Sequence, residues 1–458
     1  SNQESNPDFK LTLSEQISSI CNSKLLIEFI GVSPLPDLDL ENALTKLRSL
    51  VLSSISKISV TSKLLKFQSA LALHCFTNEY IYRTNPIERK EIERLEKKIK
   101  TKLFQGKQPA PEAVLCLASY KPLYQCDWVK ALKKSPEIAA VFQRQLEEPE
   151  LEEELKSLIP NYGKITNEIS SKVREQYEKN PYPRWVNLKL STKPETILDS
   201  FRRLNLKIFS EAIFQTEAPR VLIAGCGTGQ HSLGTADRFR ESKVLAIDLS
   251  LASLAYAQRK TNELGVSNIQ YAQVDILDLE KLNNKFDVIE SVGVLHHMSN
   301  PLEGWRVLTS CLEVGGIMKI GLYSSLARRH IRKIRKEIAD LGVESNTQEM
   351  LTYRNHLVNS NKKHHSQTTN SFDFFTVSTL RDLIFHSQEH TYTIPKIKDN
   401  LDQLGLKFCG FESNKISHFR DIYCKPNDVH DLDLWEKFEE ANPSAFSGMY
   451  QFWCQKVI

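Results

Sequence analysis

The sequence predicts an α/β protein with a doubly wound, mostly parallel sheet, an α-helical N-terminal domain and a helical insert. Three observations support this fold class. Short apolar runs alternate with amphipathic stretches from 200 to 324, as they do when helices cover both faces of a parallel sheet. Apolar residues recur at helical spacing from 11 to 159, without strand alternation. The segment 325–392 opens with another helical pattern and precedes the last strands.

The elements of the core follow one another in a regular order. Ser250 is well placed to cap the helix that follows it, and Gly315–Gly316 suggest a turn before a strand. The patterns predict helices at 201–214, 231–240, 251–264, 301–312, 392–404 and 432–440, and strands at 221–224, 243–247, 269–274, 286–291, 317–322, 406–411 and 448–457.

A glycine-rich loop stands at the centre of this pattern. Four apolar residues, 221–224, read as a strand buried on both faces. Gly225, Gly227 and Gly229 follow at once, and Asp248 ends the next strand. Strand, glycine loop, helix, strand and terminal carboxylate make a nucleoside-binding βαβ unit, in which the carboxylate can accept hydrogen bonds from a ribose diol.

Composition excludes several classes of protein. At 458 residues the chain predicts two or three domains, and 41% hydrophobic and 25% charged residues are typical of a globular protein. A net charge of +4 favours neither a nucleic-acid nor a membrane partner. The nine cysteines lack metal-ligand spacing, which indicates reduced thiols. With no secretory signal and no apolar run near the ~18 residues of a membrane helix, we expect a cytoplasmic protein.

We divide the chain into five segments. They are a helical N-terminal domain at 1–165, a linker or active-site flap at 166–199, the nucleoside-binding core at 200–324, a substrate-side insert or lid at 325–392, and the C-terminal part of the sheet at 393–458. Two prolines at 181 and 183 enforce an extended path in the second segment. Two interpretations are equally open: a rigid connector, or a flap that brings Tyr177, Tyr182, Arg184 or Trp185 to the ligand.

Four motifs in order carry a family resemblance. They are Val-Leu-Ile-Ala-Gly-Cys-Gly-Thr-Gly, Ala-Ile-Asp-Leu-Ser, Val-Asp-Ile-Leu-Asp-Leu and Phe-Asp-Val-Ile-Glu-Ser-Val-Gly-Val-Leu-His-His-Met. Together they resemble the Rossmann-like (class I) S-adenosylmethionine-dependent methyltransferases. The chain also resembles bacterial methyltransferases that join a helical or tetratricopeptide region to this core. The resemblance implies a seven-stranded sheet whose seventh strand is antiparallel, with S-adenosylmethionine as cofactor.

The resemblance also implies the cofactor-binding residues. The loop lacks the wider Gly-x-Gly-x-x-Gly spacing suited to a pyrophosphate, and S-adenosylmethionine has no phosphate. The predicted set comprises Gly225, Cys226, Gly227 and Gly229 in the loop, Asp248 and Leu249 at the ribose, Asp275 and Ile276 at the adenine, Glu290 and Ser291 near the sulfonium, and Tyr177 and Arg184 from the flap.

Candidate catalytic residues follow the fourth strand and end the insert. Methyl transfer needs an aligned acceptor, and it needs a general base only if the acceptor carries a proton. His296 and His297 could reach the acceptor, although packing or capping is expected of at least one. The insert adds Arg381, Asp382, His386, Glu389 and His390. We expect His386 or His390 to orient or deprotonate the acceptor, but a polar network that only braces the insert has equal weight.

Two further features of the insert leave alternatives open. His386, Glu389 and His390 match the His-x-x-Glu-His spacing of zinc peptidases, which would place two histidines on one helix face; we predict no metal, because such short motifs arise by chance. The basic stretch 328–336 reads as a solvated helix face with Ile331 and Ile334 turned inward, or as a site for an acidic peptide, a phosphate or RNA. The polar residues 344–370 suggest a mobile loop or lid.

The sequence therefore predicts a methyltransferase that acts on a peptide or protein side chain, with a possible protein partner on the helical domain. A small-molecule methyltransferase is the alternative. An RNA methyltransferase and a non-catalytic S-adenosylmethionine-binding protein are weaker hypotheses. The acceptor atom and the oligomeric state stay open.

Overall fold

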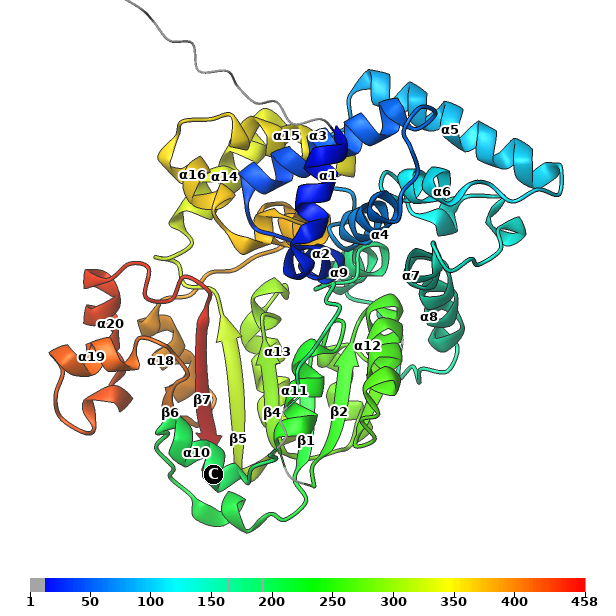
Figure 1. Cartoon of the computed structure of the whole chain (residues 1–458). Coiled ribbons are helices and arrows are strands. Elements are labelled where there is room, and N and C mark those ends of the chain that lie inside the picture. Colours follow the sequence, from blue (N-terminus) through cyan, green and yellow to red (C-terminus); the bar gives the residue numbers. More distant parts are fainter. Residues whose placement is uncertain (1–12, 164, 191–192, 240, 458) are drawn as a thin grey trace, which may run out of the picture.

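A computed structural model describes residues 13–163, 165–190, 193–239 and 241–457. Figure 1 shows a sheet flanked by helices, with a large helical region gathered at one end of the sheet. Arg240, the last residue of the helix predicted at 231–240, lies outside the described residues, as do the first two residues of the helical pattern at 11–159.

The sheet has the predicted topology. Its seven strands run in the order β3-β2-β1-β4-β5-β7-β6, and β7 is antiparallel to both neighbours while the other pairings are parallel. The order reverses between β1 and β4, which is where ligands bind in open α/β sheets. The strands are β1 (Arg220–Ala224), β2 (Lys243–Asp248), β3 (Ile269–Gln273), β4 (Phe286–Val292), β5 (Leu312–Leu322), β6 (Leu406–Phe411) and β7 (Tyr450–Lys456).

Strand β1 is buried on both faces, as the sequence predicts. Val221 and Ile223 belong to one apolar cluster, and Leu222 and Ala224 belong to another on the opposite face. Ser250 caps α12, because its Oγ accepts from the backbone N–H of Ser253 at 3.1 Å. The helices of this part are α10 (Ile197–Leu204), α11 (Gln230–Arg238), α12 (Leu251–Leu264), α13 (Pro301–Cys311), α18 (Ile394–Gln403), α19 (Ile416–Ile422) and α20 (Leu432–Ala441).

Two element predictions in the core are wrong. The helix predicted at 201–214 ends at Leu204, because Asn205 takes a left-handed conformation (φ 51°), and only a short 3-10 turn, Glu211–Gln215, follows. The predicted turn at Gly315–Gly316 lies inside β5, which begins at Leu312. The register between β4 and β5 shifts there and Gly315 has φ 83°, so the glycines accommodate a bulge within a continuous strand.

The N-terminal segment is helical, and its helices share one apolar core with the insert. Leu44, Phe67 and Leu115 belong to the same buried cluster as Ile331 and Phe374. The division into domains stays a prediction. The helices are α1 (Leu13–Asn22), α2 (Lys24–Val32), α3 (Leu38–Ser54), α4 (Ser62–Thr77), α5 (Pro86–Phe104), α6 (Pro111–Ala118), α7 (Ala139–Phe142), α8 (Glu148–Lys156), α9 (Glu168–Lys179), α14 (Arg329–Leu341), α15 (Thr347–Val358), α16 (Lys363–Thr369) and α17 (Val377–Leu380).

The loop predicted at 344–370 is wrong, since α15 and α16 occupy most of it. Its polar composition conceals an apolar face, because Met350, Tyr353 and Leu357 are buried at helical spacing. The prediction that Ile331 and Ile334 of the basic stretch turn inward is confirmed, because both are buried on α14.

None of the described helices is long and apolar enough to cross a membrane. All nine cysteines lie in the described part of the chain and are free.

Candidate active site

A cavity opens at the carboxyl ends of β1, β2 and β4, the point at which the strand order reverses. Its volume is about 210 Å³. The glycine loop, Asp248, the flap and the turn after β4 all contribute. Its lining comprises Ile169, Ser170, Val173, Tyr177, Tyr182, Pro183, Gly225, Cys226, Gly227, Gln230, His231, Asp248, Leu249, Ser253, Val292, Gly293, Val294, His297 and Met298.

The glycine loop needs glycine at two of these positions. Gly225 has φ 79°, and a Cβ there would collide with the side chain of Val294. Gly227 has φ 52°, and its Cβ would lie 2.5 Å from the carbonyl oxygen of Tyr182. Left-handed backbone and close approach both favour glycine. The loop is thus closed on one side by the turn after β4 and on the other by the flap.

Asp248 stands at the end of β2 with its carboxylate in the cavity wall. One oxygen accepts from the backbone N–H of Gly227 at 2.8 Å and the other from that of Ser250 at 3.0 Å. Burial raises the pKa of Asp248, and these backbone donors oppose the rise. Each carboxylate oxygen has a second lone pair, so the group can accept two more hydrogen bonds from a diol.

The segment predicted as a linker or flap packs on the glycine loop and also lines the cavity. Its role at a ligand stays a prediction. The indole N–H of Trp185 donates to the carbonyl of Thr228 at 3.1 Å, and the N–H of Thr228 donates to the carbonyl of Tyr182 at 3.3 Å. Tyr177 and Tyr182 line the cavity. Arg184 instead pairs with Glu79 at 3.3 Å and lines a second cavity.

Six predicted cofactor residues do not belong to the described lining: Arg184, Gly229, Asp275, Ile276, Glu290 and Ser291. Asp275 caps the turn after β3 by accepting from the N–H of Leu277 at 3.0 Å. Ser291 donates to the carbonyl of Ala224 at 3.1 Å. Their roles at the cofactor stay predictions.

Glu290 is fully buried in a polar network on β4. Its carboxylate accepts hydrogen bonds from Arg238, His231 and Thr235. Burial alone would raise the pKa of Glu290, but Arg238 and His231 hold it well below its usual range. The carboxylate therefore binds three polar side chains of α11.

The predicted catalytic residues separate into two groups. His386 stacks on His297, with ring centroids 3.6 Å apart, and His297 lines the cavity. His296 is buried beside Tyr323, with ring centroids 4.1 Å apart, and neither of its ring nitrogens has a partner in the described part of the chain. His297 belongs to the same motif as His296, but the sequence gives no signal to decide which of two neighbours in a short turn faces the ligand.

Arg381, Glu389 and His390 are held by other contacts. Arg381 donates to the carbonyl of Ser345, and Glu389 pairs with Arg328 at 2.8 Å. The backbone N–H of His390 donates to the carbonyl of His296 at 2.8 Å. Residues 386–390 form no helix, because the preceding helical turn ends at Phe385, so the zinc-peptidase arrangement of two histidines on one helix face is wrong.

Comparison with known proteins agrees with this geometry. Residues 221–316 match a family model described as a methyltransferase domain. An uncharacterized protein of Synechococcus sp. is 31% identical over 209 residues, which are 43% of this chain and 49% of that protein. Malonyl-[acyl-carrier protein] O-methyltransferase of Bacillus cereus is 31% identical over 113 residues, 25% of this chain and 40% of that protein. PKMT2 of Rickettsia typhi is 18% identical, with a TM-score of 0.44 over 57% of this chain and 52% of that one.

The chain thus spans about half the length of the first of these relatives. Its core, residues 221–316, is a methyltransferase domain, and the fold is the Rossmann-like class I fold of S-adenosylmethionine-dependent methyltransferases. The resemblance of the core to these methyltransferases is confirmed.

Proposed function

We propose that this protein transfers a methyl group from S-adenosylmethionine to a side chain of a peptide or protein. The observation that carries the proposal is one cavity with two different walls. The glycine loop and Asp248 form one wall, and the flap with His297 forms the other. A donor and an acceptor can thus meet inside the same cavity.

The residues of the first wall fit the cofactor. S-adenosylmethionine supplies a methyl group on a positively charged sulfur, which becomes a neutral thioether when the methyl leaves. Asp248 offers carboxylate oxygens to the ribose hydroxyls, and the glycines let the loop backbone turn closely between Val294 and Tyr182. Tyr177, Tyr182 and Pro183 line the same cavity, and a wall of this kind can hold the two reactants in alignment.

The helical region supports a polymeric acceptor. α14 buries Ile331, Ile334 and Ile338 and exposes Arg329, Arg332, Lys333 and Lys336. An exposed basic helix beside the acceptor wall can attract an acidic segment of a peptide. The Bacillus cereus relative is named an O-methyltransferase for a malonyl-[acyl-carrier protein], which favours a small acyl or metabolite acceptor as the second candidate.

Labelled methyl groups test the acceptor class. The protein is incubated with fractionated lysate and S-adenosylmethionine that carries a labelled methyl, with Asp248→Asn as the matched control. Label in protein that depends on Asp248 is the expected result. Label in small molecules would replace the proposal with the second candidate, label in RNA would contradict both, and no label in any fraction would contradict an active methyltransferase.

A further inference from the structure

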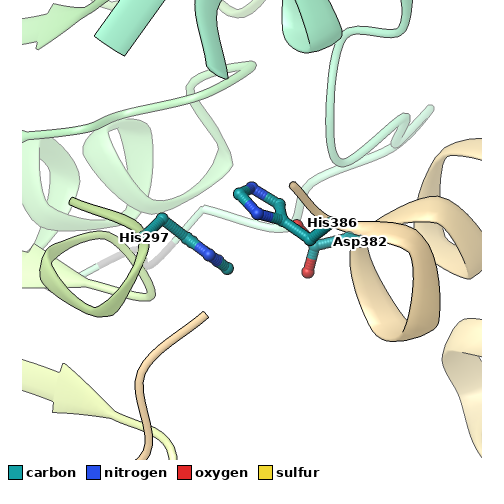
Figure 2. A group of neighbouring side chains, drawn as sticks. All are labelled: His297, Asp382 and His386. Carbon is teal, nitrogen blue, oxygen red and sulfur yellow. The ribbon is translucent and has the colours of Figure 1, made fainter. Parts of the chain in front are cut away.

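Three buried side chains meet at the acceptor wall, and the proposed function does not yet give them a role. Figure 2 shows the imidazole rings of His297 and His386 face to face, with the carboxylate of Asp382 beside them. One nitrogen from each ring and one carboxylate oxygen all lie within 4.8 Å of one another. The hydroxyl of Tyr177 donates to Asp382 at 2.7 Å. The three come from the turn after β4 and from the end of the insert.

The backbone of Gln388 gives the two rings opposite tautomers. Its carbonyl oxygen can only accept, so His297 Nδ1, 2.7 Å away, carries a proton and Nε2 of that ring keeps a lone pair. The N–H of Gln388 can only donate, so His386 Nδ1, 3.1 Å away, has the lone pair and Nε2 of that ring carries the proton. The pair therefore offers one acceptor and one donor.

The donor nitrogen has no partner in the described part of the chain. His386 Nε2 is buried and unpaired, in a side chain only 3% exposed. A buried polar group without a hydrogen bond destabilises the folded protein. Burial, with a smaller contribution from His297, lowers the pKa of His386 to about 3, and burial also lowers that of His297. Both rings are neutral near pH 7, and a ligand that accepts from Nε2 would satisfy the unpaired donor.

The arrangement fits a hydrogen-bonded group better than a metal ion. A metal ion would need a lone pair on Nε2 of each ring, whereas Nε2 of His386 carries a proton. His386 would also have to give up its bond from Gln388 to ligate through Nε2.

We infer that His297 and His386 hold the methyl acceptor, and that this acceptor is a hydroxyl group. A hydroxyl donates once and accepts, which matches the lone pair of His297 Nε2 and the N–H of His386 Nε2. An ammonium group has only donors and would face the N–H of His386. This inference rests on the proposed function, because it names the acceptor atom of the same site.

The proton of the hydroxyl then has a defined path. The acceptor oxygen forms its bond to the methyl carbon, the electron pair of the broken carbon–sulfur bond stays on sulfur, and the hydroxyl proton moves to His297 Nε2. Asp382, an opposite charge within 4.8 Å, favours the imidazolium that results. Release of that proton to water restores the neutral ring. His297 is thus a catalytic base, whereas Asp382 and Tyr177 are positioning residues.

Nitrogen-15 NMR of the full chain, labelled in histidine and saturated with S-adenosylhomocysteine, tests the tautomers. The expected spectrum has His297 protonated on Nδ1 and His386 protonated on Nε2. His297→Ala and His386→Ala assign the two signals, and His418→Ala, at an exposed position on α19, is the control. The same tautomer in both rings would overturn the inference.

Benzyl alcohol and benzylamine, which differ only in the polar group, then test the acceptor. Benzyl alcohol should shift both Nε2 signals, and benzylamine should not. His386→Gln, whose amide can donate from a similar position, should keep alcohol binding, whereas His386→Ala should weaken it about tenfold, the equivalent of one hydrogen bond. A response to benzylamine alone, no response to either probe, or tight binding of Zn²⁺ that His297→Ala removes would overturn the inference. Calorimetric titration of the unchanged protein with S-adenosylhomocysteine separates failure of this inference from failure of the proposed function. If S-adenosylhomocysteine does not bind, the proposed function itself is contradicted.

Discussion

The two walls of the cavity are built in different ways. The donor wall consists of the glycine loop and Asp248, which follow two neighbouring strands within a short stretch of sequence. The proposed acceptor wall has Tyr177 of α9 and His297 after β4 in the cavity lining, and Asp382 and His386 of the insert pack against them. These four residues are up to 209 positions apart in the sequence. The donor wall depends on local backbone geometry, whereas the acceptor wall depends on how the helical region packs onto the sheet.

The largest expected effect concerns the ion pair that joins the N-terminal helices to the insert. Arg354 donates to both carboxylate oxygens of Glu41 at 2.7 Å, in a buried position. Glu41→Gln leaves the guanidinium buried with a neutral partner, and we expect a loss of about 3 kcal/mol in the free energy of unfolding. Denaturant unfolding measures it, with Glu344→Gln, at an exposed position, as the control.

The same variant sharpens the comparison of the two walls. Because Glu41 supports the acceptor wall through the insert, Glu41→Gln should reduce methyl transfer while the affinity for S-adenosylhomocysteine changes less than threefold. A parallel loss of both would show that the donor wall also depends on the helical region.

The second expected effect is a dependence of stability on pH. The pKa of His386 is lowered to about 3 in the folded protein by burial and by His297, against about 6.5 in the unfolded chain. The unfolded state then binds more protons as the pH falls below 6.5, so folding loses about 2 kcal/mol between pH 7 and pH 5 through this group. His386→Gln should remove that part of the acid sensitivity in denaturant unfolding at the two pH values. Equal sensitivity in the variant would mean that other groups carry it.

The third prediction concerns the contact between the glycine loop and the flap. Gly227→Ala places a Cβ 2.5 Å from the carbonyl oxygen of Tyr182 and strains a left-handed residue. We expect a loss of about 1–2 kcal/mol in unfolding free energy and a weaker affinity for S-adenosylhomocysteine. Gly234→Ala is the matched control, because it lies in α11 with nothing within 4 Å of its Cβ. An unchanged affinity in Gly227→Ala would show that the contact between the glycine loop and the flap does not affect the donor wall.

The sequence predicts the strands and helices of the sheet region well, because local patterns of residues determine them. The bounds 251–264 and 406–411 match the helix and strand that form there, and the antiparallel last strand is confirmed. The wrong predictions also have physical causes. Residues 344–370 are mostly polar, so the buried face of Met350, Tyr353 and Leu357 was not recognisable as a helix pattern. The left-handed Asn205 ends a helix although the apolar pattern continues beyond it.

The acceptor wall could be predicted only in part. His386 was a candidate, but its contact with His297 depends on the path of a chain segment of about 90 residues. The tautomers depend on the backbone of Gln388, which carries no sequence signal at all. Arg381, Glu389 and His390 look equally reactive in the sequence, yet their partners are structural.

One measurement tests the central claim directly: calorimetric affinity for S-adenosylhomocysteine in Asp248→Asn and in His297→Ala. The account predicts that Asp248→Asn loses about 30-fold, the equivalent of about 2 kcal/mol for hydrogen bonds to a charged group. His297→Ala should stay within threefold of the unchanged protein. An unchanged affinity in Asp248→Asn, or a loss in His297→Ala as large as that expected for Asp248→Asn, would contradict the assignment of the two walls.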